Sequence, residues 1–139
     1  MRTLNLGSNS TMVAFAPFAL RIAVGLVFVM HGWMKLQGGV AGTAGFLGQI
    51  GFPMPEVFAV LLIAAELGGG ILLILGALTT WTALVLTIVS FVALTMVHIT
   101  KGFFVNEGGY EFILLILAVC ISLMVTGAGR WSVDHALKK

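Results

Sequence analysis

Charged residues are scarce in this chain. Asp, Glu, Lys and Arg make up 9% of its 139 residues, whereas 60% are hydrophobic. Soluble domains carry about 25% charged residues, because they must cover their surface with polar groups. The composition therefore predicts an integral membrane protein, and the length allows one compact domain without a separate soluble module.

Cysteine is nearly absent as well. The single cysteine, Cys120, excludes an intramolecular disulfide and a zinc or iron–sulfur cage built on several cysteines. It lies in an apolar run, which indicates a small buried hydrophobic residue. The formal net charge of +2 is small and scattered, and it predicts no nucleic-acid partner.

Long apolar runs dominate what is present. We expect helices at about residues 12–34, 57–78, 81–98 and 110–126. A helix of about 20 residues crosses a hydrocarbon core of about 30 Å. The tight connections predict antiparallel neighbours, and hence an all-α, four-helix integral membrane bundle. Residues 12–134 would form this transmembrane domain, between a polar N-terminal tail at 1–11 and a basic C-terminal tail at 135–139.

Local signals predict where several of these helices begin and end. Pro17 lies near the start of the first helix, where the first turn tolerates proline. Glu56 suits the first turn of the second helix, because the helix dipole favours an acid there. Thr79 and Thr80 are expected to cap the third helix, and Gly127 to stop the fourth.

Glycine recurs with a period of three between the first two apolar segments, at positions 39, 42, 45, 48 and 51. The run is too short, and too poor in proline, for collagen. Between the glycines, Val40, Ala44, Leu47 and Ile50 form a helical stripe. We therefore expect a short helix that lies in the membrane interface or packs over the mouth of the bundle.

The distribution of basic residues predicts the orientation. Four spans place both termini on one side of the membrane, together with Arg2, Arg130, Lys138 and Lys139; the other side carries Lys35 and Lys101. Loops rich in Lys and Arg stay in the cytoplasm. Both termini are therefore expected to be cytoplasmic.

Two charges lie deep in the apolar segments. Glu66 is near the middle of the second helix, and a carboxylate at that depth costs about 2.5–3.5 kcal/mol. Arg21, in the first helix, is the other deep charge and has the opposite sign. We therefore predict a buried Arg21–Glu66 ion pair. Two roles for this pair are open at this point: it could be purely structural and fix the register of the two helices, or it could take part in the function of the protein.

A second group of titratable residues is expected at the opposite mouth of the bundle from the termini. His31 and Lys35 are four residues apart and share a helix face, while His98 and Glu111 lie near the ends of the third and fourth helices. The alternative interpretation is that each is only a solvent-exposed polar side chain at the end of a helix, without a role in binding. Because polar residues at membrane depth are often functional, these four are candidates for ligand binding or proton relay.

A set of short motifs extends over nearly the whole chain. In order they are His31-Gly32-x-x-Lys35, Gly51-Phe52-Pro53-Met54-Pro55, Glu66-Leu67-Gly68-Gly69, Leu75-Gly76-x-x-Thr79, His98 with Gly102-Phe103-Phe104, Gly109-Tyr110-Glu111, and Gly127-x-Gly129-x-x-Ser132-x-Asp134. In this order and spacing the chain resembles the DoxX family. These are small bacterial four-helix membrane proteins related to the membrane subunit of a thiosulfate:quinone oxidoreductase.

The resemblance implies a protein of the bacterial plasma membrane with a link to quinone or thiol redox chemistry. Without a cysteine pair, the chain cannot itself cycle a disulfide. The leading hypothesis is an accessory or quinone-interacting subunit that works with a redox enzyme partner. His31, His98 and Glu111 would then bind a quinone head group or relay protons. The sequence contains no self-contained catalytic motif.

Two other functions stay open at this stage. His31 and His98 could ligate a haem iron from two helices. Alternatively, the chain is a non-catalytic assembly protein or a small-molecule transporter, with the glycine run 68–70 contacting a second protomer in a homo-oligomer. Close packing of that run inside one chain is the competing interpretation.

Overall fold

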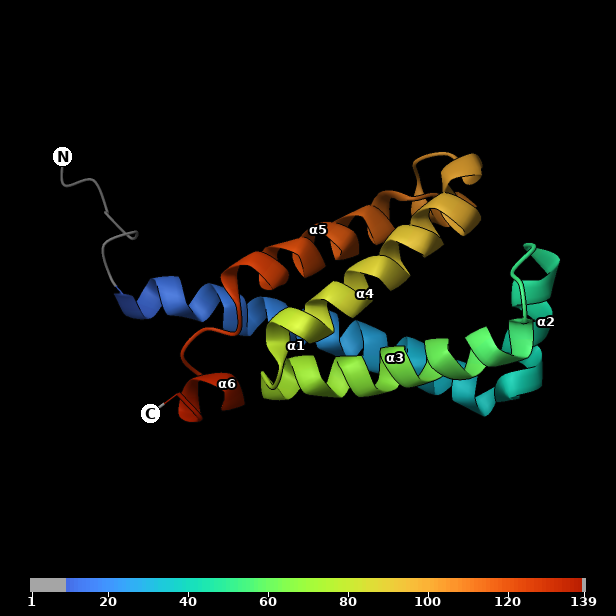
Figure 1. Cartoon of the computed structure of the whole chain (residues 1–139). Coiled ribbons are helices and arrows are strands. Elements are labelled where there is room, and N and C mark those ends of the chain that lie inside the picture. Colours follow the sequence, from blue (N-terminus) through green and yellow to red (C-terminus); the bar gives the residue numbers. More distant parts are fainter. Residues whose placement is uncertain (1–9, 139) are drawn as a thin grey trace.

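The computed structural model describes residues 10–138, and these form helices and turns without a β-strand (Figure 1). The predicted all-helical class is confirmed. Most of the predicted N-terminal tail lies outside the described residues. The helices are α1 (Ser10–Gln37), α2 (Gly39–Gln49), α3 (Pro55–Leu75), α4 (Thr79–Ala93), α5 (Glu111–Thr126) and α6 (Val133–Ala136). A π-helical turn (Leu94–His98) and two 3₁₀ turns (Ile99–Lys101 and Val105–Glu107) join α4 to α5.

Three helical stretches are long and apolar enough to cross a membrane. They are Val13–Gln37, Pro55–Leu75 and Thr79–Lys101; α5 is equally apolar but has 16 residues. Large apolar side chains such as Leu26, Ile88 and Leu115 are exposed on the outer faces. Such exposure suits contact with lipid rather than water.

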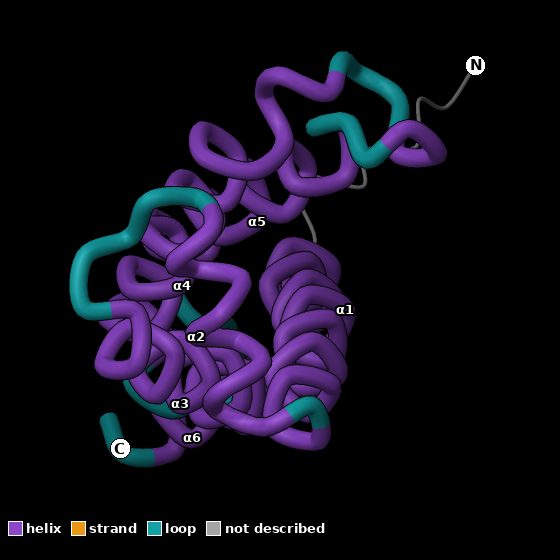
Figure 2. The backbone as a smooth tube through the Cα atoms, turned by 90° about the vertical axis from the view of Figure 1, so that its right-hand side faces the viewer, coloured by secondary structure: helices purple, strands orange, loops and turns teal. Residues whose placement is uncertain are grey.

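The long helices pack as two antiparallel pairs, α1 with α3 and α4 with α5. Helix α4 joins the pairs through its contact with α3. The α4–α5 pair diverges from α1–α3 toward the segment that connects α4 to α5 (Figure 1). The opposite end is closed by α6, beside the first turns of α4 and the last turn of α3 (Figures 1 and 2).

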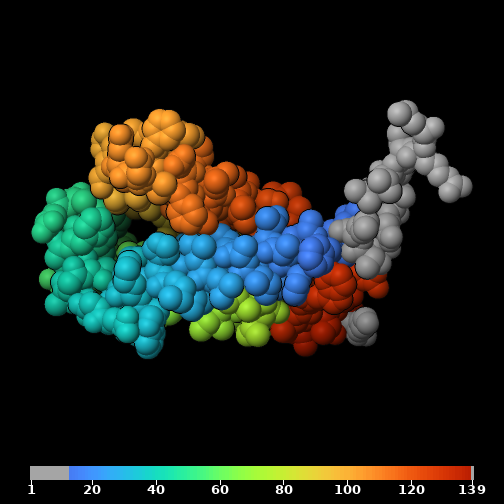
Figure 3. Space-filling view, turned by 180° about the vertical axis from the view of Figure 1, so that it is seen from behind, coloured from blue at the N-terminus to red at the C-terminus, as the bar shows by residue number. Residues whose placement is uncertain are grey.

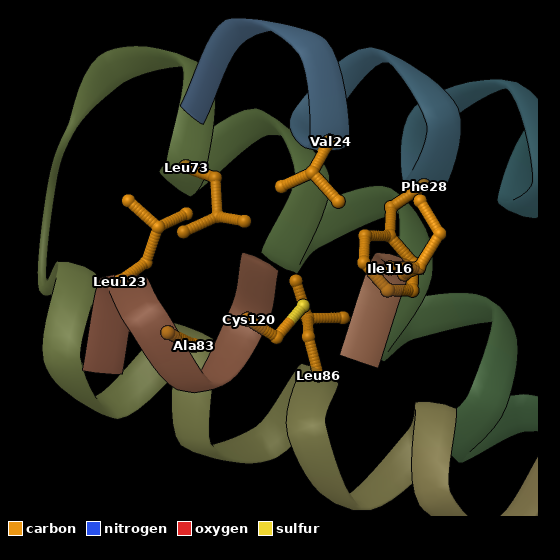
Figure 4. Packing of buried hydrophobic residues seen from close by; sticks show 8 residues of the cluster. All are labelled: Val24, Phe28, Leu73, Ala83, Leu86, Ile116, Cys120 and Leu123. Carbon is orange, nitrogen blue, oxygen red and sulfur yellow. The ribbon is translucent and has the colours of Figure 1, made fainter. Parts of the chain in front are cut away.

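The core lies where the four long helices meet. Its buried residues are Val24, Phe28, Leu73, Ala83, Leu86, Ile116, Cys120 and Leu123 (Figure 4). Cys120 has no exposed surface, as the sequence predicted. A smaller cluster of Ala44, Leu47 and Ala59 holds α2 against α3.

Glycines bring α1 and α3 into backbone contact. A Cβ atom added to Gly70 would lie 2.7 Å from the carbonyl oxygen of Gly25, and one added to Gly32 would lie 2.8 Å from the amide nitrogen of Leu67. Real Cβ atoms do not approach backbone this closely, so no larger residue fits without separating the helices. Small residues at a helix contact are the usual means of close packing in membranes.

The glycine run 68–70 mostly serves packing inside the chain. Gly70 faces α1, and Gly69 faces α4, where an added Cβ would lie 3.1 Å from Leu86. An added Cβ on Gly68 would meet no atom within 4 Å. Two of the three glycines are therefore occupied by internal contacts.

Two predicted helix signals differ from the structure. Pro17 is the eighth residue of α1, beyond the first turn, because the helix begins at Ser10. The predicted Thr79–Thr80 cap is wrong. Thr79 is the first residue of α4, and the carboxylate of Asp134 accepts the backbone N–H groups of Leu78 (2.7 Å) and Thr79 (2.8 Å). Glu56 does lie in the first turn of α3.

We predict that Gly70→Ala lowers the free energy of unfolding by about 1–3 kcal/mol, because the added methyl group overpacks the α1–α3 contact. Gly68→Ala is the matched control: it makes the same change two residues away, where the methyl group meets open space, and it should be neutral. The free energy of unfolding of both variants can be measured by denaturation in mixed detergent micelles. Equal effects of the two substitutions would contradict the assigned contact.

Candidate functional site

Glu66 is buried and forms an ion pair with Lys35. Lys35 Nζ donates to Glu66 Oε2 at 2.7 Å, with the two side chains 22% and 8% exposed. It is the only salt bridge within residues 10–138. The predicted Arg21–Glu66 pair is therefore wrong, although both residues are buried as expected. Lys35, one of the four candidates expected at the mouth of the bundle, turns inward to this carboxylate.

The register of α1 against α3 explains this pairing. Gly25 lies opposite Gly70, and Gly32 lies opposite Leu67 and Glu66. Side chains on a helix lean toward its N-terminus. Lys35, one turn beyond Gly32, therefore leans back to the level of Glu66, whereas Arg21 leans away from it toward the end of α3.

A small apolar pocket adjoins the ion pair. It has a volume of about 250 Å³ and is lined by Lys35, Gly38, Gly42, Thr43 and Phe46. The last three residues belong to α2, so this short helix forms one wall. In Figure 3 the surface at this end is also hollowed between α2 and the segment that joins α4 to α5. Lys35 thus pairs its ammonium group with a buried carboxylate, while its side chain lines one wall of an apolar space.

The other candidates at this end make separate contacts. His31 is exposed, and its Nδ1 donates to the carbonyl of Val27, 2.8 Å away on its own helix. His98 Nδ1 donates to the carbonyl of Gly108 at 2.7 Å. Glu111 Oε1 accepts the N–H of Val105 at 2.7 Å.

Those bonds divide the predicted cluster. Within residues 10–138, no hydrogen bond joins His31, Lys35, His98 and Glu111 to one another. His98 and Glu111 instead hold the segment between α4 and α5, and Lys35 belongs to the ion pair. No group of three or more His, Cys, Asp or Glu side chains in the described residues is placed to hold a metal ion.

Arg21 has a different role from the predicted one. Its guanidinium is fully buried and donates to four backbone carbonyls: those of Leu73 (3.0 Å), Ile74 (3.1 Å), Ala128 (2.9 Å) and Trp131. The first two carbonyls lie in the last turn of α3, where carbonyls lack the usual helical partners; that of Leu73 also accepts the N–H of Gly76 at 3.0 Å. Backbone carbonyls are a usual partner for a cation at membrane depth. Arg21 therefore joins α1, α3 and the segment after α5.

The segment after α5 completes this junction, which sequence reasoning missed. Asp134 caps α4, its N–H donates to the carbonyl of Gly76 at 2.9 Å, and Ser132 Oγ accepts the N–H of His135. Gly76 has φ +67°, and an added Cβ would collide with Arg21 and Ser132. The signal was present in two motifs, Leu75-Gly76-x-x-Thr79 and Gly127-x-Gly129-x-x-Ser132-x-Asp134, which the structure brings together.

Comparison with known proteins identifies the family. The DoxX family matches residues 16–99, more than half of the chain. The chain belongs to the DoxX family. This range includes the Lys35–Glu66 pair but ends before the segment that Arg21 binds.

Curated relatives extend the DoxX similarity over most of the chain. The Bacillus subtilis protein named "Putative oxidoreductase CatD" is 33% identical over 83% of this chain and 81% of its own length. The Escherichia coli "Inner membrane protein YqjF" is 31% identical over 86% and 89%, respectively. A Mycobacterium tuberculosis membrane protein is 33% identical over 86% and 80%. No solved structure matches. Together with the apolar helices, these relatives establish a membrane protein.

We predict that Lys35→Met lowers the free energy of unfolding by about 3 kcal/mol, because it leaves the Glu66 carboxylate buried without a partner. The double variant Lys35→Met/Glu66→Gln should recover most of this loss, since it removes both charges. Lys101→Met, at an exposed lysine, is the control. A Lys35→Met protein as stable as the parent would exclude the pair as a structural contact.

Asp134 provides a pH-dependent prediction. Burial alone would raise the pKa of Asp134, but hydrogen bonds from Thr79 and Leu78 and the charge of Lys138 lower it below the ordinary value of 3.8. A carboxyl group with a lowered pKa stabilises the fold above its unfolded pKa, and this contribution is lost as the pH falls through the folded pKa.

We therefore expect Asp134→Ala to lower the free energy of unfolding by about 1–2 kcal/mol at pH 7, as for loss of a helix cap. The difference from the parent protein should begin to shrink near the unfolded pKa of an aspartate, about 3.9, and continue to shrink as the pH falls through the lowered pKa of folded Asp134. Unfolding curves at pH 7, 5 and 3.5 measure it. A difference that stays constant over this range would exclude the carboxylate as the cause.

Proposed function

We propose that this chain is a quinone-interacting accessory subunit of a membrane oxidoreductase system, and that a quinone head group binds in the pocket beside Lys35. The observation that carries the proposal is the buried Lys35–Glu66 pair at the wall of that pocket. A structural ion pair has no need of an adjoining space. A ligand in this space would contact the Lys35 side chain, and the ammonium group at its end would donate a hydrogen bond to the ligand.

The residues around the pocket suit a quinone. A quinone carbonyl is an uncharged acceptor, and the Lys35 ammonium has three donors, of which Glu66 takes one. Phe46 and the glycine backbone supply apolar contact for a flat ring. The volume, about 250 Å³, is just below the range of about 300–1,000 Å³ typical of whole-ligand sites. It therefore suits a head group whose tail remains in the lipid.

In this proposal Glu66 holds the Lys35 ammonium in place. Since the carboxylate is nearly inaccessible, it acts on the ligand only through Lys35. The name of the Bacillus subtilis relative supports a redox association. The predicted proton relay through His31, His98 and Glu111 stays a prediction.

The membrane topology belongs to the same proposal. Helices α1, α3, α4 and α5 each span the bilayer of the bacterial inner membrane, with α5 as the shortest span. Helix α2, which carries buried Thr43, Ala44 and Leu47 on one side, lies at the interface. The basic residues 130 and 138 lie beside α6, which favours a cytoplasmic location for both termini.

An assembly role is the second candidate, and Gly68 is the observation that favours it. This glycine lies on α3 with open space where its side chain would be. A redox enzyme partner or a second copy of the chain could pack closely there. Gly68→Leu would then abolish co-purification of the partner and leave quinone binding unchanged.

We predict that a short-chain quinone raises the melting temperature of the purified protein, because a ligand that binds only the folded state stabilises it. Gly42→Leu should abolish this shift. An added Cβ at Gly42 meets no atom within 4 Å, so the leucine fits the fold and fills the pocket.

Gly45→Leu is the matched control. Gly45 lies on the same helix, also has open space around it, and does not line the pocket. It should preserve the full quinone-induced shift. Equal shifts in both variants, or no shift in the parent protein, would refute the site.

A further inference from the structure

The end of the molecule closed by α6 carries a pocket that the proposed function does not use. It has a volume of about 580 Å³ and lies between the start of α4, the end of α5 and α6. Its polar lining consists of the hydroxyl residues Thr79, Thr80, Thr126 and Ser132 together with Arg130, Asp134, His135 and Lys138. The quinone pocket at α2 is at the other end of the bundle.

The pocket has excess positive charge. Arg130 and Lys138 are exposed, and neither has an ion-pair partner within residues 10–138. Asp134 is the one carboxylate in the lining, and both of its oxygens already accept backbone N–H groups of Leu78 and Thr79. Two unpaired cations beside an occupied carboxylate favour an anionic ligand.

The rim of the pocket is apolar and exposed. Leu78 and Trp81 line it from α4, and Leu137 lines it from the end of α6. Their exposed fractions are 63%, 69% and 81%. Trp131, also exposed, lies next to Arg130 in sequence. Tryptophan beside basic residues is typical of the level of the lipid headgroups.

We propose that this pocket binds the headgroup of an anionic phospholipid. Arg130 and Lys138 would contact the phosphate, with the hydroxyl group of Thr80 in the same lining, while Trp81 and Leu137 contact the glycerol and upper acyl region. The combination of a cationic interior with an exposed apolar rim distinguishes a lipid from a free anion. Free phosphate would gain from the cations alone and would leave the rim exposed to water.

The test is native mass spectrometry of the full chain in detergent with added phosphatidylglycerol or phosphatidylcholine. We expect phosphatidylglycerol to bind more tightly. Arg130→Gln and Lys138→Gln should each weaken its binding about fivefold, since a basic residue near the membrane surface contributes about 1 kcal/mol to attraction of anionic lipid. Lys101→Gln removes an exposed lysine at the opposite end and should change binding less than twofold.

Three results would overturn the proposal. They are equal binding of the two lipids, an equal effect of Lys101→Gln and Lys138→Gln, and complete displacement of phosphatidylglycerol by millimolar inorganic phosphate. The last result would assign the pocket to a free anion. All substituted side chains are exposed, so the variants should melt at the same temperature as the parent protein in lipid-free detergent.

Discussion

The fold depends on the backbone contact between α1 and α3. Gly25 and Gly32 on α1 meet Gly70 and Leu67 on α3 so closely that a single added methyl group does not fit. This contact fixes the register of the two helices, and the register decides which charges can meet. Glu66 precedes Gly70 by one helical turn and therefore faces α1. Because Gly32 lies opposite Glu66, the cation one turn beyond it, Lys35, becomes its partner.

The two deep charges, Arg21 and Glu66, are stabilised in different ways. The partners of Arg21 are all backbone groups, whereas the partner of Glu66 is a side chain that also lines a pocket. Arg21 donates hydrogen bonds to backbone carbonyls of α3 and of the segment after α5. It has no exposed surface and no ligand can reach it. The Lys35–Glu66 pair offsets a cost of about 2.5–3.5 kcal/mol for a lone carboxylate at this depth, and the Lys35 side chain also lines a pocket. Only the second arrangement places a residue of the charged pair beside an open space.

The sequence predicts the all-helical class, the four apolar segments, and the burial of Glu66, Arg21 and Cys120. It does not predict the ion pair, because periodicity shows which residues share a helix face but not how two helices are aligned along their length. Arg21 and Lys35 are 14 residues apart on one face of α1, which is about 21 Å, and either could face Glu66. His98 is harder to place, since it ends the π-helical turn Leu94–His98, which breaks the period of 3.6 residues by which residues are assigned to a helix face. The contacts of the segment after α5 depend on tertiary structure alone.

Helix α3 contacts α1, α2 and α4, and its glycine run allows the close approach of α1 and α4. Consecutive residues of a helix point about 100° apart. Three adjacent glycines therefore leave out side chains on three sides of α3 within one helical turn, and neighbouring helices can approach closely there. Gly70 admits α1 and Gly69 admits Leu86 of α4, while Glu66, one turn before Gly70, shares the side that faces α1. A side chain larger than hydrogen at Gly70 would push α1 outward one helical turn away from Glu66, and so would alter the distance that Lys35 must span. The close packing of α1 and α3 and the pairing of the buried charge are therefore one constraint, and a substitution that relaxes the first should weaken the second.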